Sequence, residues 1–212
     1  MKIVVVCSDE KHPIYPRLDR WRQGKSGKHD VSLVSNIVFA NGGDILFLIS
    51  CTEIVGPDVR NKFLHTLVIH ASDLPFGRGW SPHVWQLLEG RNEITVSLIE
   101  ATDPVDSGNI WAKERVSFNG TELFDEISSA IFDAELYLMD FALENYELIV
   151  PKQQDHSRAT FYRRRSPEDS RIDVEQTLLS QFNLLRVCDP VRYPAFFEYE
   201  GVRYELFLKK AN

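Results

Sequence analysis

The stretch TLVIHASDLPFGRGWSPHVW, residues 66–85, decides the fold of this chain. An apolar, β-branched run ends at His70 and is followed by a loop that holds two prolines and two glycines. Such a run is typical of a strand buried on both faces of a parallel sheet. Ser81 and Pro82 then match a helix N-cap with proline at the first helical position. The stretch therefore predicts a buried strand, a polar loop and a helix, in that order.

The segments on either side continue the alternation of strands and helices. Strands are expected at residues 2–8, 31–34, 44–50, 66–70, 93–101 and 109–118, and helices at 57–63, 82–90 and 121–145. Residues 9–30 form a polar stretch for which no element is predicted. This order of elements favours an α/β fold with a mostly parallel sheet.

The C-terminal part differs in composition. Residues 173–187, DVEQTLLSQFNLLRV, predict a helix, and residues 195–210 predict a β-hairpin that turns at Glu200-Gly201. We therefore expect a main domain at 1–154 and a small C-terminal subdomain of helix and hairpin at 155–212. The aromatic residues of the hairpin are expected to form the subdomain core or a contact in a homodimer.

Composition excludes several classes of protein. The 212 residues carry a formal net charge of −7, which argues against a general nucleic-acid binder. Three scattered cysteines without a CxxC pair predict neither a disulfide framework nor a metal site. The apolar run at residues 3–7 is too short for a signal peptide, and no longer apolar span follows. We expect a cytoplasmic protein with no membrane contact and no metal.

Two residues are candidates for chemistry. His70 ends a central strand, and ligands of open α/β sheets bind at the carboxyl ends of strands. The alternative is a histidine that merely caps the strand. Asp106 lies in the loop TDPVDSG, residues 102–108, where a carboxylate could fix the tautomer of the imidazole. The alternative for Asp106 is a turn aspartate that bonds its own backbone.

The combination HASDLPFGRGWSPHVWQLLEG and ATDPVDSGNIW resembles the folate-dependent formyltransferases. This family pairs a His-x-Ser-x-Leu-Pro segment with a later Asp-x-Gly, and it implies a Rossmann-like formyltransferase fold. The C-terminal segments RRRSPEDSRID and QFNLLRVCDPVRYPAFF are similar to those of bacterial sugar N-formyltransferases. The loop GRGWSPHVW is similar to a compact, pseudaminic-acid-pathway branch of that group, which is linked to polysaccharide biosynthesis.

The resemblance implies transfer of a formyl group from 10-formyltetrahydrofolate to the amine of an amino sugar. His70 and Asp106 match the catalytic histidine and aspartate of the family. The family's asparagine two residues before the histidine is Val68 here, which cannot donate to an oxyanion. We expect Ser72 or a loop amide to take that role, with Thr66 as a further candidate.

The resemblance also assigns the two substrates to loops. The folate is expected at Ser50, Cys51, Thr52, Glu53, Ile54, Ala101, Thr102, Asp103 and Val105. Arg78 and Trp80 are expected to contact the acceptor, an amino sugar that is nucleotide-linked or belongs to a nonulosonic-acid pathway. Because Val68 replaces the asparagine, two alternatives stay open: a weakly active or inactive folate-binding regulatory protein, and a hydrolase of 10-formyltetrahydrofolate.

Overall fold

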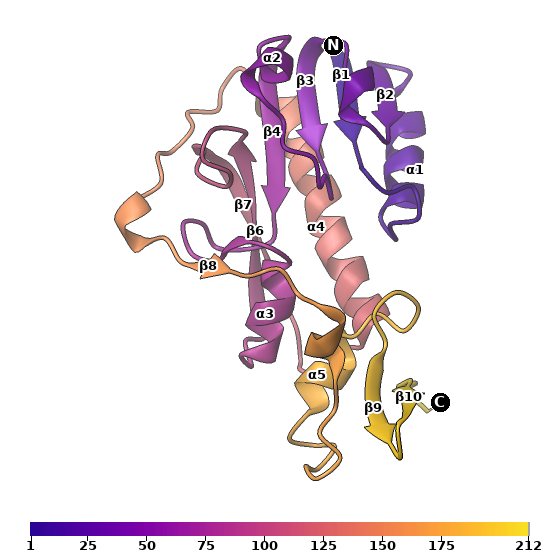
Figure 1. The fold of residues 1–212 in the computed structure, drawn as a ribbon. Helices are drawn as coiled ribbons and strands as arrows, with labels where there is room; N and C mark the ends of the chain where they lie inside the picture. The colour runs from indigo at the N-terminus through magenta and orange to yellow at the C-terminus, as the bar shows by residue number, and fades with distance from the viewer. Residues whose placement is uncertain (212) are drawn as a thin grey trace.

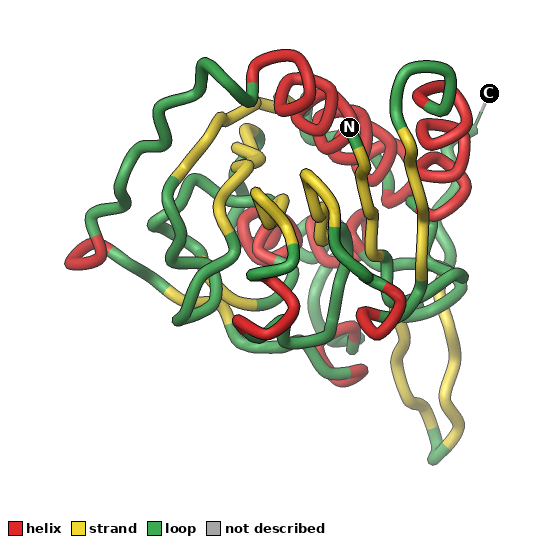
Figure 2. Tube along the Cα trace, turned by 90° about the horizontal axis from the view of Figure 1, so that it is seen from above, coloured by secondary structure: helices red, strands yellow, loops and turns green. Residues whose placement is uncertain are grey.

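The computed structural model describes residues 1–211 and contains a six-stranded sheet with α1 and α4 on one face (Figures 1 and 2). The strands of this sheet are β1 (Lys2–Val6), β2 (Asp30–Val34), β3 (Gly43–Leu48), β4 (Phe63–His70), β6 (Glu93–Glu100) and β7 (Ile110–Ser117). The helices are α1 (Tyr15–Lys25), α2 (Pro57–Arg60), α3 (Pro82–Leu88), α4 (Phe124–Asn145) and α5 (Phe182–Val187), with 3-10 turns η1 (Ile37–Phe39), η2 (His156–Arg158) and η3 (Pro167–Ser170). Two smaller pairs are β5 (Arg78–Gly79) with β8 (Phe161–Tyr162), and β9 (Ala195–Tyr199) with β10 (Val202–Leu206).

The predicted α/β fold with a mostly parallel sheet is confirmed. In the order β2-β1-β3-β4-β6-β7, the first four strands are parallel, whereas β6 runs antiparallel to β4. The last residue of β6, Glu100, therefore lies opposite Leu67, and the amide of Ala101 donates to the oxygen of Thr66 at 2.8 Å. As a result, the loop after β6 begins beside the middle of β4 and not at its carboxyl end.

The side chains of β4 alternate between the two faces of the sheet. Leu67 and Ile69 belong to the large hydrophobic core, which also contains the inner residues of α1 and α4. Val68 packs with the smaller apolar cluster on the opposite face, which also includes Ala101. His70 shares the face of Val68, so its ring points toward the side where the loop after β6 lies.

Two predicted helices are shorter in the structure, and one helix was missed. The helix expected at 173–187 is only α5, because the side chain of Asp173 accepts backbone and amide hydrogen bonds from the residues after it and holds them in turns. The polar stretch 9–30 contains α1, for which the spacing of the buried Leu18 and Trp21 was the available signal. The helix expected at 57–63 ends at Arg60.

The C-terminal hairpin is confirmed. Its turn places Glu200 at φ 50° and Gly201 at φ 76°, which are the backbone angles that a two-residue turn between antiparallel strands requires. A separate small apolar cluster lies behind it, formed by Ile172, Leu185, Cys188 and Ala195. The boundary between 154 and 155 and the homodimer both stay predictions.

Candidate active site

A cavity of about 590 Å³ surrounds the carboxyl ends of β3 and β4. Its lining brings together the predicted pair, His70 and Asp106, and the predicted acceptor contacts, Arg78 and Trp80. It also includes every residue predicted for the folate: Ser50, Cys51, Thr52, Glu53, Ile54, Ala101, Thr102, Asp103 and Val105. Ser72 and the further candidate Thr66 are absent from the lining.

His70 is held by a backbone carbonyl on one side of its ring. Its Nε2 lies 2.9 Å from the oxygen of Gly77, and the side chain is 9% exposed. A carbonyl oxygen only accepts hydrogen bonds, so Nε2 carries the hydrogen. In the neutral ring Nδ1 therefore has a lone pair, and Nδ1 is the nitrogen that gains or gives up a proton.

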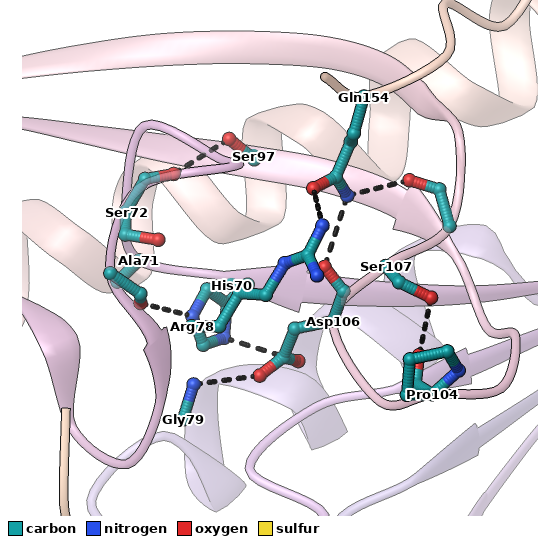
Figure 3. A network of polar contacts seen from close by, with 12 residues as sticks. His70, Ala71, Ser72, Arg78, Gly79, Ser97, Pro104, Asp106, Ser107 and Gln154 are labelled. Atoms are coloured by element: carbon teal, nitrogen blue, oxygen red, sulfur yellow. Dashed lines mark hydrogen bonds and ion pairs between the residues drawn. The ribbon is translucent and has the colours of Figure 1, made fainter. Parts of the chain in front are cut away.

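Asp106 faces this nitrogen. Its Oδ1 lies 3.6 Å from Nδ1 of His70, and its Oδ2 accepts a hydrogen bond from the amide of Gly79 at 2.9 Å (Figure 3). The separation of 3.6 Å exceeds a direct hydrogen bond and suits attraction between a carboxylate and an imidazolium. The carboxylate of Asp106 therefore lies beside the ring nitrogen of His70 that is not bonded to Gly77.

The loop of Asp106 has a conformation that few sequences allow. Asp106 has φ 62°, in the left-handed region that aspartate tolerates better than most residues. A Cβ on Gly108 would lie 1.8 Å from the oxygen of Glu100, so only glycine fits there. The Asp-x-Gly spacing thus has a steric cause, because it lets the loop return close to β6 while Asp106 reaches His70.

Gln154, which the sequence analysis missed, joins the two loops of the site. Its Nε2 donates to the oxygens of Asp106 at 3.0 Å and Gly108 at 2.7 Å, and its Oε1 accepts from Arg78 at 2.7 Å (Figure 3). Arg78 is 4% exposed and also contacts Nδ1 of His156 at 2.8 Å. Its guanidinium is therefore turned toward neutral partners within the protein, although Arg78 lines the cavity.

The expected replacements for the family's asparagine are not available in the cavity. Val68 lines the cavity, whereas Ser72 is 1% exposed and its hydroxyl has no hydrogen-bond partner among the described residues. Thr66 is likewise outside the lining. The backbone amides of residues 77–80 all donate to other groups, namely Thr160 Oγ1, Thr160 O, Asp106 Oδ2 and Tyr162 O. Among these candidates, none points a free donor at the cavity.

The predicted folate segments present apolar and polar groups together. Ile54 is 82% exposed and Val105 is 59% exposed, so both leave an apolar side chain at the cavity. Asp103 forms an ion pair with Arg60 at the end of α2, which also lines the cavity. Two exposed apolar side chains that flank polar loops suit a flat heterocycle.

Trp80 lies at the cavity beside a basic segment. Its side chain is 42% exposed, and the guanidinium of Arg164 lies 4.7 Å from the ring centroid. Ser81 occupies the predicted N-cap of α3, but with φ 47° and no capping hydrogen bond from its side chain. Within residues 1–211, no group of three or more metal-ligating side chains is gathered.

Comparison with known proteins identifies the family. The sequence model of the formyl transferase family matches residues 37–142, which is half of the chain. The chain therefore belongs to the formyl transferase family and is an enzyme of folate-dependent formyl transfer.

Solved structures share the fold at low identity. A methionyl-tRNA formyltransferase from Clostridium thermocellum is 23% identical, with a TM-score of 0.84 over 100% of this chain and 94% of that chain. HypX from Aquifex aeolicus, solved in complex with tetrahydrofolic acid, is 20% identical, with a TM-score of 0.80 over 98% of this chain and 37% of that one. A sugar N-formyltransferase from Shewanella is 13% identical, with a TM-score of 0.77 over 100% and 98%. The fold is thus that of formyltransferases with different acceptors.

The helices show no sign of a membrane segment. None of those within residues 1–211 combines the length and the apolar character that a membrane-crossing helix needs.

Proposed function

We propose that this enzyme transfers the formyl group of 10-formyltetrahydrofolate to the amine of an amino sugar that is nucleotide-linked or part of a nonulosonic-acid pathway. The observation that carries the proposal is the shared cavity. His70, Asp106 and all of the expected folate residues line one space of about 590 Å³, which has room for more than a water molecule beside the pair.

His70 and Asp106 have distinct roles in this proposal. Attack of the amine on the formyl carbon develops negative charge on the formyl oxygen. The Nδ1–H of a protonated His70 donates to that oxygen, because Nε2 is already bonded to Gly77. Asp106, whose Oδ1 lies 3.6 Å from Nδ1 of His70, interacts with the imidazolium by charge.

The two substrates bind at opposite sides of this pair. Residues 50–54 and 101–105 bind the pterin of the folate between backbone groups and the apolar side chains of Ile54 and Val105. The ring of Trp80 stacks on the acceptor, and Arg78 attracts its acidic groups by charge. The net charge of −7 favours a small acceptor over a transfer RNA.

Turnover of 10-formyltetrahydrofolate tests the proposal. Wild type and His70→Ala are compared with and without a panel of nucleotide-linked and acidic amino sugars. Release of tetrahydrofolate that needs an amino sugar and is lost in His70→Ala supports the proposal. Release without a sugar would instead establish a hydrolase.

One alternative is favoured by a specific observation. Val68 stands at the family's asparagine, and neither Ser72, Thr66 nor the amides of residues 77–80 replace that donor. A folate-binding protein with weak or no turnover is therefore the second candidate. Loss of one oxyanion donor typically lowers the rate by about 10²–10³-fold. Tight folate binding without turnover on any acceptor would favour it.

A further inference from the structure

The carboxylates that line the cavity differ in how they are held. Five acidic side chains lie in the lining, and four of them have partners. The four are Glu53 with the amide of Ile37, Glu100 with Asn109 and Trp111, Asp103 with Arg60, and Asp106 with Gly79 and His70. The fifth, Glu135, makes no hydrogen bond or ion pair with any residue in 1–211.

Glu135 comes from α4, the helix that packs against the face of the sheet opposite His70. Its side chain is 9% exposed, and its Oε2 is buried without a hydrogen-bond partner. A buried carboxylate with no partner is costly, and native structures rarely keep one without a functional reason. Because Glu135 also lines the cavity, a molecule bound in the cavity can supply the missing partner.

The groups around Glu135 supply no positive charge. Burial lowers the pKa of His83, on α3, to about 4 and also lowers the pKa of His12, in the loop after β1. Burial raises the pKa of the Cys7 thiol, at the end of β1, to about 11. All three are therefore uncharged at pH 7, and burial raises the pKa of Glu135 itself to about 8.

The arginines that act on these two histidines are engaged elsewhere. Arg192, which acts on His12, forms an ion pair with Asp9 at 3.0 Å. Arg165, which acts on His83, donates to the oxygen of Asp169 at 2.9 Å. The histidine of the catalytic pair, His70, faces Asp106. A cation that pairs with Glu135 once it is ionised must therefore come from a ligand.

We propose that Glu135 is the residue that binds the acceptor's ammonium group and takes its proton before the amine attacks the formyl carbon. This inference rests on the proposed function. The competing base, Asp106, already accepts from Gly79 and faces His70, so its oxygens are occupied in a way that those of Glu135 are not.

The proton balance of the step is simple. The carboxylate of Glu135 accepts one proton from the ammonium, and the N–H electron pair becomes the lone pair of the neutral amine. That lone pair forms the bond to the formyl carbon, and the bond from this carbon to the folate nitrogen breaks. The second amine proton leaves with tetrahydrofolate, and Glu135 returns its proton to water.

The first test uses simple sugars and needs no turnover. D-glucosamine and D-glucose differ at one position, where an amine replaces a hydroxyl. Thermal shifts at pH 8 are measured with each sugar for wild type, Glu135→Gln and the control Glu144→Gln, which removes an exposed carboxylate from the same helix. We expect glucosamine to raise the Tm more than glucose in wild type and Glu144→Gln, and equally in Glu135→Gln.

The second test uses the reaction. With the acceptor that supports turnover, kcat/KM of Glu135→Gln should fall at least tenfold while the KM for the folate is unchanged. In wild type kcat/KM should rise with pH as Glu135 ionises, and this rise should be absent in Glu135→Gln. Equal shifts with the two sugars in wild type, or an amine preference that survives in Glu135→Gln, would overturn the inference. An intact amine preference without turnover on any acceptor counts against the proposed function alone.

Discussion

Gln154 holds Asp106 in place by donating from its amide to the backbone oxygen of Asp106 at 3.0 Å. The same side chain accepts from Arg78, so one buried glutamine connects the loop after β4 to the loop after β6. Gln154 belongs to a segment far along the chain. A little further on, residues 161–162 pair with residues 78–79 in the loop after β4. The relative position of His70 and Asp106 thus depends on a third segment.

Replacement of Gln154 by alanine should disturb the position of Asp106 relative to His70. We expect kcat to fall by more than tenfold and the free energy of unfolding to fall by about 1–3 kcal/mol, because buried partners lose their hydrogen bonds. Steady-state kinetics and urea unfolding measure the two effects. The exposed neighbour gives the control, Gln153→Ala, which should change neither. Equal kinetics in both variants would show that Gln154 does not position Asp106.

Asp106→Asn should remove the negative charge of this side chain and keep its shape. The asparagine oxygen can still accept from Gly79, so the loop is retained, but the attraction to a protonated His70 is lost. We expect kcat to fall by about 10²–10⁴-fold, the range of general acid–base contributions. Folate binding, followed by fluorescence titration, should stay within about twofold. A variant with near wild-type kcat would mean that Asp106 is a turn residue only.

Gly108→Ala should be among the most damaging single-methyl changes in the chain. The added Cβ would lie 1.8 Å from a backbone oxygen of β6, and backbone cannot move aside cheaply. We expect loss of at least about 2 kcal/mol in the free energy of unfolding. The control is Gly24→Ala in α1, where nothing lies within 4 Å of the new Cβ and helix propensity predicts a gain of up to about 1 kcal/mol. Chemical denaturation of both variants makes the comparison.

Glu135→Gln should raise stability as it lowers activity. Folding raises the pKa of Glu135 from 4.5 to about 8, so the folded state holds this proton more tightly than the unfolded state. The stability that the raised pKa gives to the folded state is fully present below pH 4.5 and is lost as the pH rises toward 8. The stability advantage of the variant should therefore grow from pH 5 to pH 8, to on the order of a few kcal/mol.

Tm measurements across this range, with Glu144→Gln as the control, check the prediction. A constant difference at all pH values would contradict the raised pKa.

Much of the fold follows from local pattern. Apolar runs predict the buried central strands, and alternation of apolar and polar residues predicts the half-buried strand that begins at Glu93. The hairpin is likewise predicted locally, because Glu200 and Gly201 adopt the positive φ angles of a two-residue turn. The helix expected at 173–187 failed because the side chain of Asp173 competes for the backbone, and α1 was missed because few of its residues are apolar.

The candidate site was predicted in its residue types and in its place on the chain. His70 and Asp106 were candidates from their places on the chain, and the resemblance to a family supplied their roles and the two folate segments. All of these residues line one cavity. Gln154, His83 and Glu135 carried no such signal. Gln154 lies in a segment without a recognisable pattern. His83 and Glu135 lie in helices that were predicted, but helical spacing does not tell that their side chains line the cavity.

The sequence by itself determined the α/β class, the strand that ends at His70 and the C-terminal hairpin, because these depend on neighbours along the chain. Only the tertiary structure decided which nitrogen of His70 is available, that Gln154 joins the two loops, and that Glu135 is the carboxylate without a partner. The physical reason is that hydrogen bonding and desolvation depend on which groups meet in space. For Glu135, those groups come from helices and loops far apart in the chain.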